Sequence, residues 1–156
     1  MPNNDSLFEN IYSAFLSAVE KYRLVETGDR VAVCVSGGKD SMLASLFFKR
    51  YAAENPNVTV RYICMDPGYN AENRKMIELN AEKLGIPLDI FETQIFDSVV
   101  RIEKSPCYLC ARMRRGWLYR KAKEAGCNKI ALGHHFDDVT ETVLMSTLYS
   151  GQYQTM

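Results

Sequence analysis

Six consecutive residues, Ser36-Gly37-Gly38-Lys39-Asp40-Ser41, have the composition of a phosphate-binding loop. They lie between an apolar run at 31–35 and a run typical of a helix at 42–51. Adjacent glycines let the backbone approach an anion, and the N–H groups that begin the following helix point at it. Lys39 adds a mobile positive charge, the serines add hydroxyls, and Asp40 can hold a metal ion against the phosphates. The stretch therefore predicts a cradle for a phosphate or pyrophosphate group.

The spacing of the glycines excludes two other phosphate-binding loops. A Walker A loop requires a glycine where Val33 stands, and Ser or Thr where Asp40 stands. A dinucleotide fingerprint requires three spaced glycines, and only Gly37 and Gly38 are present. The residues instead spell SGGxDS, which resembles the PP-loop of enzymes that split ATP into AMP and pyrophosphate. Without that resemblance, the alternative is a plain turn between a strand and a helix.

Cys107 and Cys110 form a CxxC pair immediately before a predicted helix, where the helix dipole favours thiolates. Thiolates at this spacing can ligate zinc, ligate an iron–sulfur cluster or act as a redox pair. A closed zinc site needs four ligands, and the sequence has no second CxxC. We expect Cys34 and Cys127 to be structural, whereas Cys64, near the end of its strand, could face the site.

Nineteen basic and nineteen acidic residues cancel, so the net charge suggests neither a nucleic-acid nor a membrane partner. Residues 101–123 differ, because they hold eight basic residues and one acidic residue, a net charge of +7. Such a face beside an ATP site could neutralise the phosphates of a polynucleotide. The simpler interpretation is a solvated helix face with Met113, Trp117 and Leu118 turned to the core. Gly116 costs about 1 kcal/mol relative to alanine in a helix, which suggests close packing or close approach of a ligand.

The elements that would position these residues alternate between strands and helices. Strands are predicted at 30–35, 58–65, 88–91 and 129–132, and helices at 6–24, from the loop to about 53, and at 71–84, 95–102, 111–125 and 138–149. This order predicts a Rossmann-like, doubly wound parallel α/β sheet of four to five strands with helices on both faces. The loops at the carboxyl ends of the strands would then gather at one edge, where ligands bind. We expect residues 1–28 to form a packing helix and 29–156 the PP-loop nucleotide-binding domain.

The composition sets the class of protein. An apolar fraction of 47% with 24% charged residues is ordinary for a soluble globular domain, and 156 residues suffice for one core. No stretch is typical of a membrane span or a signal peptide, so we expect a cytoplasmic protein that contacts no membrane. Five cysteines, an odd number, do not suggest a disulfide framework.

Two further motifs sharpen the resemblance. Residues 107–116 spell CxLCxRxRRG, and residues 132–138, followed by Glu141-Thr142, spell LGHHxDD…ET. Both are similar to segments of tRNA 2-thiocytidine synthetases, and the second is shared with tRNA-lysidine synthetases. The resemblance runs from about residue 30 to the end and implies an adenine nucleotide alpha hydrolase-like fold.

The resemblance implies an ATP-dependent, AMP-forming tRNA sulfurtransferase. Members of the family adenylate a pyrimidine carbonyl and then replace its oxygen with sulfur. The motifs most resemble those of the enzymes that convert cytidine to 2-thiocytidine. A 2-thiouridine or lysidine synthetase type of enzyme and a nucleotide-binding module without catalysis are the alternatives. The implied partners are tRNA and a sulfur donor protein or sulfide, and the chain could form a homodimer.

The resemblance also assigns roles by position. Pyrophosphate would be bound by Ser36, Gly37, Gly38, Lys39 and Ser41, and Mg²⁺ by Asp40 and Asp138. The backbone of Ile63 and Met65 would contact adenine, Gly133 would lie close to the ribose or α-phosphate, and Arg114 would reach the α-phosphate. His134, a nucleotide-binding residue in this assignment, and His135 would position the substrate. Lys39, Asp40 and Arg114 would act in catalysis. Asp137 and Asp138 begin a predicted helix, so capping is the alternative for either, and packing or capping is the alternative for His134 and His135.

In the family, Cys107 and Cys110 would bind a 4Fe–4S cluster with a third cysteine from far downstream. The sequence ends at Met156, and no third ligand is visible unless Cys64 substitutes. We therefore expect either a chain truncated at its C-terminus relative to the family or incomplete cluster binding.

Overall fold

The structure is a computed structural model that describes residues 4–93 and 106–155. Its elements, in chain order, are α1 (Asn4–Lys21), β1 (Arg30–Cys34), α2 (Lys39–Glu54), β2 (Thr59–Asp66), α3 (Ala71–Lys83), β3 (Leu88–Glu92), α5 (Pro106–Glu124), β4 (Lys129–Leu132) and α6 (Phe136–Ser150). The helix predicted at 95–102 lies outside the described residues.

The four strands form one parallel sheet in the order β3-β2-β1-β4. β1 is central, with Cys34 opposite both Ile63 of β2 and Leu132 of β4. Four of its five residues are buried, as expected of a strand covered on both faces. The predicted Rossmann-like architecture is confirmed.

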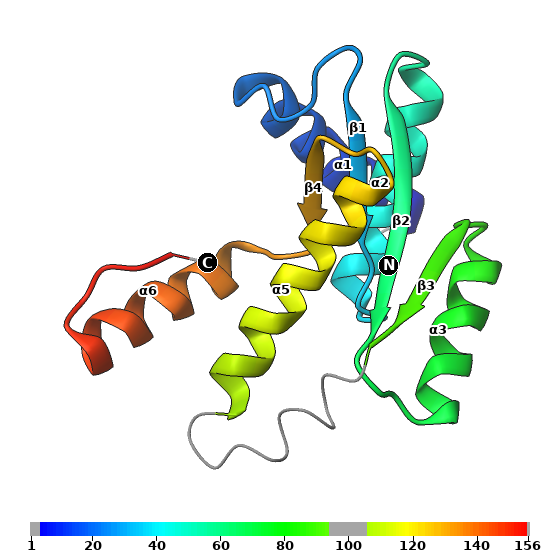
Figure 1. Cartoon of the computed structure of the whole chain (residues 1–156). Coiled ribbons are helices and arrows are strands. Elements are labelled where there is room, and N and C mark those ends of the chain that lie inside the picture. Colours follow the sequence, from blue (N-terminus) through cyan, green and yellow to red (C-terminus); the bar gives the residue numbers. More distant parts are fainter. Residues whose placement is uncertain (1–3, 94–105, 156) are drawn as a thin grey trace.

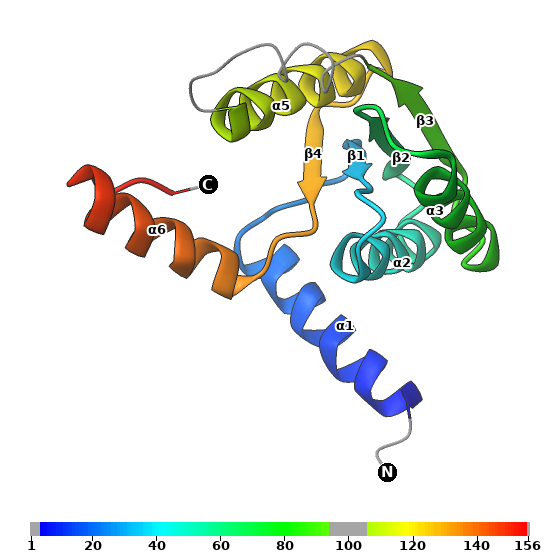
Figure 2. The same cartoon turned by 90° about the horizontal axis from the view of Figure 1, so that it is seen from below.

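Helices cover both faces of the sheet (Figure 2). Alternate residues of β1 pack into the cores on the two faces of the sheet, because successive side chains of a strand point to opposite faces. Val31 and Val33 pack into a core with residues of α1, α2 and α3. Ala32 and Cys34 pack on the other face, with Leu118 and Ala122 of α5. The site therefore has α2 on one side of the sheet and α5 on the other.

Aromatic side chains hold α1 against α2. The ring of Phe47 lies 5.3–5.6 Å from the rings of Phe8, Tyr12 and Phe15, and the Tyr12 hydroxyl donates to Glu54 at 2.7 Å. The predicted helix at 6–24 thus packs on the α/β unit, although it begins and ends earlier than expected.

α6 leaves the end of β4 and extends away from the sheet (Figures 1 and 2). None of its residues is buried. Its exposed apolar side chains are Phe136, Val139, Leu144, Met145, Leu148 and Tyr149. Across the described residues, no helix combines the length and apolarity that a membrane crossing requires.

Candidate functional site

A cavity of about 400 Å³ opens at the carboxyl edge of β1 and β4. The order of the strands changes direction here, because β2 and β3 lie on one side of β1 and β4 lies on the other. Doubly wound sheets bind ligands at such a point. Six residues predicted for the site line it: Ser36, Ser41, Met65, Arg114, Gly133 and His134. A second cavity, of about 620 Å³, lies between α1, α2 and β4, and Asp40 and His135 lie at its border with the loop.

The loop after β1 is fixed by the hydroxyl of Ser41, which is buried. This hydroxyl accepts from the backbone N–H of Ser36 at 3.1 Å and donates to the carbonyl of Gly38 at 2.9 Å. Gly37 has a φ of +87°, and a Cβ there would lie 2.6 Å from Ile77 Cγ1. Ser41 therefore shapes the loop from inside, a role that the prediction of a phosphate-binding hydroxyl did not include.

The start of α2 is open to an anion. Gly38 is the N-cap residue and has no side chain to accept from the N–H groups of the first turn. These N–H groups and the positive end of the helix dipole point out of the loop. The geometry is that of an anion site at a helix N-terminus.

Lys39 and Asp40 form an ion pair beside the loop, with Nζ 2.8 Å from Asp40 Oδ2. The hydrogen bond from Lys39 lowers the pKa of Asp40, and His135 lowers it further. The same bond raises the pKa of Lys39. The pair holds opposite charges together where a phosphate would attract Lys39 and a cation would attract Asp40.

Gly133 is needed for close backbone packing. A Cβ at this position would lie 2.7 Å from Ser41 Cα and 2.8 Å from Ser41 N. The loop after β4 therefore crosses directly over the first turn of α2. This packing explains the glycine without a ligand, whereas its contact with a ribose or α-phosphate remains a prediction.

Met65 and Ile63 are both buried, but they differ in their access to the cavity. Met65 is buried and lines the cavity. Ile63 is absent from the cavity lining, and its carbonyl accepts from the N–H of Val35 at 2.8 Å as part of the sheet. The carbonyl of Ile63 is thus engaged within the protein, and the adenine contact of Ile63 and Met65 stays a prediction.

α6 begins at Phe136 instead of 138, and His135 is its N-cap residue. The carboxylate of Asp138 accepts from the backbone N–H of His135 at 2.8 Å, and the His135 ring lies 3.5 Å from it. Asp138 therefore caps the helix, which was the alternative prediction for Asp137 and Asp138. One oxygen of Asp138 is used in this way.

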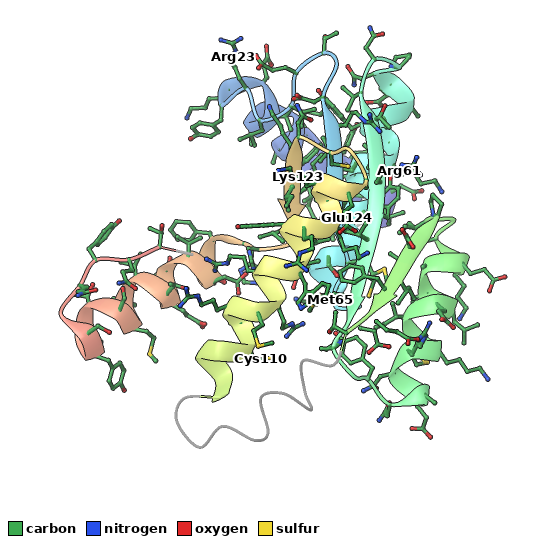
Figure 3. All side chains as sticks on the ribbon, viewed as in Figure 1. Arg23, Arg61, Met65, Cys110, Lys123 and Glu124 are labelled. Atoms are coloured by element: carbon green, nitrogen blue, oxygen red, sulfur yellow. The ribbon has the colours of Figure 1, made fainter. Side chains whose placement is uncertain are left out.

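α5 begins at Pro106, so the cysteine pair lies inside its first turns and not before the helix as predicted. Proline is favoured at the first position of a helix because it has no N–H to leave unpaired. Cys110 is half-buried in a cluster with Met65, Met113 and Trp117. Figure 3 labels Cys110 on α5 and Met65 on β2. The side chain of Cys107 lies outside what the structure describes.

Cys64 does not provide the missing third ligand. It is buried on the face of the sheet opposite Met65 and Cys110, and burial raises the pKa of its thiol to about 11. Burial also raises the pKa of Cys34, to about 12, and that of Cys127. Among the described side chains, which do not include that of Cys107, no three His, Cys, Asp or Glu residues converge as metal ligands. Of the predicted cysteine pair, the described side chains therefore include Cys110 alone.

The remaining surface of α5 is basic. Arg112, Arg115, Arg120 and Lys123 are exposed, while Met113, Trp117 and Leu118 turn inward as predicted. A Cβ on Gly116 would meet nothing within 4 Å, so the predicted close packing there is wrong.

The sequence reasoning missed two prominent residues of the cavity wall, Arg115 and Tyr119. With Ala111, Arg114 and Leu118 they are spaced by three and four residues along α5, which places them on one side of the helix. The signal was present, since Arg114 had been assigned to the site and its helical neighbours share its face.

Comparison with known proteins gives the same motifs a context. Residues 7–154 match the model of a family described as PP-loop domain. A tRNA-cytidine(32) 2-sulfurtransferase of Neisseria meningitidis serogroup A is 37% identical over 98% of this chain and 49% of its own length. One from Anaeromyxobacter sp. is 37% identical over 100% of this chain and 53% of its own. The chain spans about half the length of these relatives.

Solved structures resemble the fold. The U34-tRNA thiolase NcsA from Methanococcus maripaludis, solved with its 4Fe–4S cluster, superposes with a TM-score of 0.78 at 25% identity, over 94% of this chain and 52% of that one. An NH3-dependent NAD synthetase from Campylobacter jejuni has a TM-score of 0.55 at 17% identity over 97% of this chain and 76% of its own. The latter shows a shared fold alone.

Proposed function

Because this chain belongs to the PP-loop domain family, we propose that it is the nucleotide-binding part of an ATP-dependent tRNA sulfurtransferase. In this proposal it adenylates a pyrimidine carbonyl in tRNA, and sulfur then replaces the oxygen. Cytidine is the favoured base, since the relatives at 37% identity are named for cytidine 32. The structural neighbour named for U34 is 25% identical and supports uridine as the second candidate.

The observation that carries the proposal is the cavity of about 400 Å³ between the anion-binding loop and α5. It brings Ser36 and Ser41 of the loop into one wall with Arg114 of the basic helix. A nucleotide whose pyrophosphate lay on the loop would have its α-phosphate between the start of α2 and Arg114. Charge that develops there in the transition state would meet donors that are already in place.

The reaction has two balanced steps. In the first, the carbonyl oxygen of the base attacks the α-phosphorus of ATP, the bond to the β-phosphate oxygen breaks, and pyrophosphate leaves. In the second, a sulfide-level sulfur attacks the activated carbon, and the C–O bond breaks to release AMP. Lys39 and the N–H groups at the start of α2 would bind the leaving pyrophosphate, and Arg114 would bind the α-phosphate.

Magnesium would fit the loop with few protein ligands. Mg²⁺ is usually held by one or two carboxylates together with substrate phosphates and water. The carboxylate of Asp40 and the second carboxylate oxygen of Asp138 would be the protein ligands of the ion. When bound, the ion would neutralise phosphate charge.

We propose that Cys107 and Cys110 would supply two ligands of a 4Fe–4S cluster, which when bound would supply a binding site for sulfur. Residues separated by three positions in a helix lie on the same face, which suits joint ligation. The remaining ligand would have to come from beyond the described residues. The cluster reported with the thiolase neighbour supports this assignment.

Two further partners belong to the proposal. The sulfur donor is a protein or free sulfide, and a tRNA substrate would locate the activity in the cytoplasm. The exposed apolar side chains of α6 support association of two copies, which light scattering of the purified chain would detect as twice the monomer mass.

Exchange of radiolabelled pyrophosphate into ATP tests adenylation directly. We expect exchange that depends on tRNA and disappears in Lys39→Ala, because the loop would lose its mobile cation. Lys83→Ala, at the exposed end of α3, is the matched control. Nucleotide binding without exchange in the full-length protein would favour the non-catalytic module instead.

A further inference from the structure

A stripe of four exposed side chains runs along α5, and its members are Arg112, Arg115, Tyr119 and Lys123. They follow one another at intervals of three and four residues, which places them on one side of the helix. The stripe extends from near Cys110 to Lys123, and Figure 3 labels these two residues on α5. Proteins that bind unpaired nucleotides combine positive charge with aromatic rings in this way.

The positive charges of this stripe are available to a partner. Arg112, Arg115 and Lys123 form no ion pair with any residue that the structure describes. Lys121 of the same helix, by contrast, pairs with Glu124 at 2.8 Å. Three positive charges on one side of a helix suit a chain of phosphates, because each contact with a phosphate releases counterions.

Two members of the stripe, Arg115 and Tyr119, also line the cavity. Tyr119 is 50% exposed, and its hydroxyl makes no hydrogen bond with the described part of the chain. Leu132, at the end of β4, is a second exposed apolar side chain of the same cavity, at 43%. The cavity thus offers an aromatic ring and an aliphatic side chain to a flat ring system that enters it from solvent.

Exposure separates this part of the cavity wall from the part assigned to ATP. Arg114 and Leu118, which neighbour the stripe on α5, are half-buried, and Ser41 of the loop is buried. A nucleotide with its phosphates between the loop and Arg114 would therefore occupy the inner part of the cavity. A base that belongs to an RNA has to enter from solvent, and Arg115 and Tyr119 are the members of the α5 wall that solvent reaches.

We propose that Tyr119 is the platform on which an unpaired nucleotide of an RNA loop stacks as its base enters the cavity, and that Arg115 binds a phosphate beside it. That this RNA is a substrate rests on the proposed function, whereas the contact itself needs no ATP. Enzymes that act on a base take it out of its stack, and an aromatic side chain replaces the stacking that the base loses. Arg115 lies one helical turn from Tyr119, about 6 Å along the axis, so one nucleotide can meet both side chains.

Binding of an end-labelled RNA hairpin with cytidines in its loop, followed by fluorescence anisotropy without ATP, tests the platform. Tyr119→Ala should weaken binding about tenfold, because one stacked base is lost. Tyr119→Leu keeps apolar bulk without an aromatic ring and should be equally weak, whereas Tyr119→Phe keeps the ring and should bind as tightly as the wild type. Tyr22→Ala removes an exposed ring just after α1 and should have no effect.

The form of the RNA and the salt dependence separate stacking from charge. A full duplex of the same sequence has no unpaired base, so Tyr119→Ala should not weaken its binding. Arg115→Ala should make the slope of log K against log salt less steep by about one, whereas Tyr119→Ala should leave the slope unchanged. Equal losses for hairpin and duplex in a folded Tyr119→Leu variant, or a Tyr119→Phe variant as weak as Tyr119→Leu, would overturn the platform.

Because ATP is absent from this measurement, its result is independent of adenylation. A chain that binds the hairpin through Tyr119 but exchanges no pyrophosphate into ATP would support the platform and reject the adenylation. A chain that exchanges pyrophosphate, yet binds the hairpin equally well as wild type and as Tyr119→Leu, would reject the platform alone.

Discussion

Gly133 joins the two chain segments that form the cavity, although it has no side chain to offer a ligand. Its Cα lies so close to Ser41 that a Cβ would meet the backbone of α2 at 2.7–2.8 Å. Backbone atoms cannot rotate away as a flexible side chain can, so the methyl group of Gly133→Ala must separate the loop from α2. We expect the overpacking to lower the free energy of unfolding by about 1–3 kcal/mol. Because the displaced loop and α2 line the cavity, ATP affinity should also fall, by about tenfold. Isothermal titration calorimetry measures this.

Gly116 provides the matched control, because the same methyl group would meet no atom within 4 Å. In the interior of α5, Gly116→Ala should raise the free energy of unfolding by about 1 kcal/mol through helix propensity alone. ATP affinity should stay at the wild-type value. Equal ATP affinity in the two alanine variants would disprove the packing role assigned to Gly133.

Among the elements, the junction of β1 and β4 depends on one carboxylate at the edge opposite the cavity. Asp29 Oδ2 accepts from the backbone N–H of Glu26 at 2.7 Å and pairs with Lys129 Nζ at 2.8 Å, while Oδ1 accepts from Asn128 Nδ2 at 2.7 Å. Asn128 and Lys129 lead into β4, so Asp29 fixes where that strand begins beside β1. The hydrogen bond from Lys129, before the others, lowers the pKa of Asp29 to about 2.

This lowered pKa predicts a definite dependence on pH. A carboxyl whose folded pKa lies below its unfolded value, about 3.9, stabilises the fold above that value and loses the contribution as pH falls toward 2. We expect Asp29→Asn to lower the thermal midpoint near pH 7, with the gap to wild type closing as pH falls from about 5 to 2. Circular dichroism melts at several pH values measure this. Asp89→Asn, at an exposed position of β3, is the control, and a gap independent of pH would contradict the assignment.

At the scale of the whole molecule, the fold was predictable because its signals are local. The apolar run at 31–35, with polar turns and helical spacing around it, defines a strand covered on both faces and hence a parallel sheet. The same reasoning brought Ser36 and Gly133 to one edge, since parallel strands end together, whereas Arg114 was assigned from the resemblance. Both predictions needed only the order of elements.

The parts that sequence could not give depend on register and on packing between distant segments. Cys64 and Met65 are neighbours near the end of β2, yet alternation places them on opposite faces, and proximity along the chain misassigned Cys64 to the site. The start of α5 was missed because Pro106 was not recognised as a first helical residue.

The distribution of charge leads to a final prediction, which also rests on tRNA as the substrate. Arg112 and Lys123 are exposed on α5, and Lys123 lies toward the opposite end of the helix from Cys110 (Figure 3). Each lysine or arginine that contacts a phosphate releases counterions, so binding weakens with salt along a slope set by the number of contacts. We expect Arg112→Ala to weaken tRNA binding and make the slope of log K against log salt less steep by about one.

The double variant Arg112→Ala, Lys123→Ala should change that slope by about two if both residues contact phosphates. Lys83→Ala removes one positive charge from an exposed position of α3 and serves as the control for net charge alone. Filter binding at several salt concentrations gives the slopes. Because the chain as a whole is neutral, a nonspecific effect of charge should appear equally in Lys83→Ala and Arg112→Ala. A slope that becomes less steep in Arg112→Ala and not in Lys83→Ala would mean that α5 is the surface on which tRNA lies. Equal slopes in the two variants would reject this role for α5.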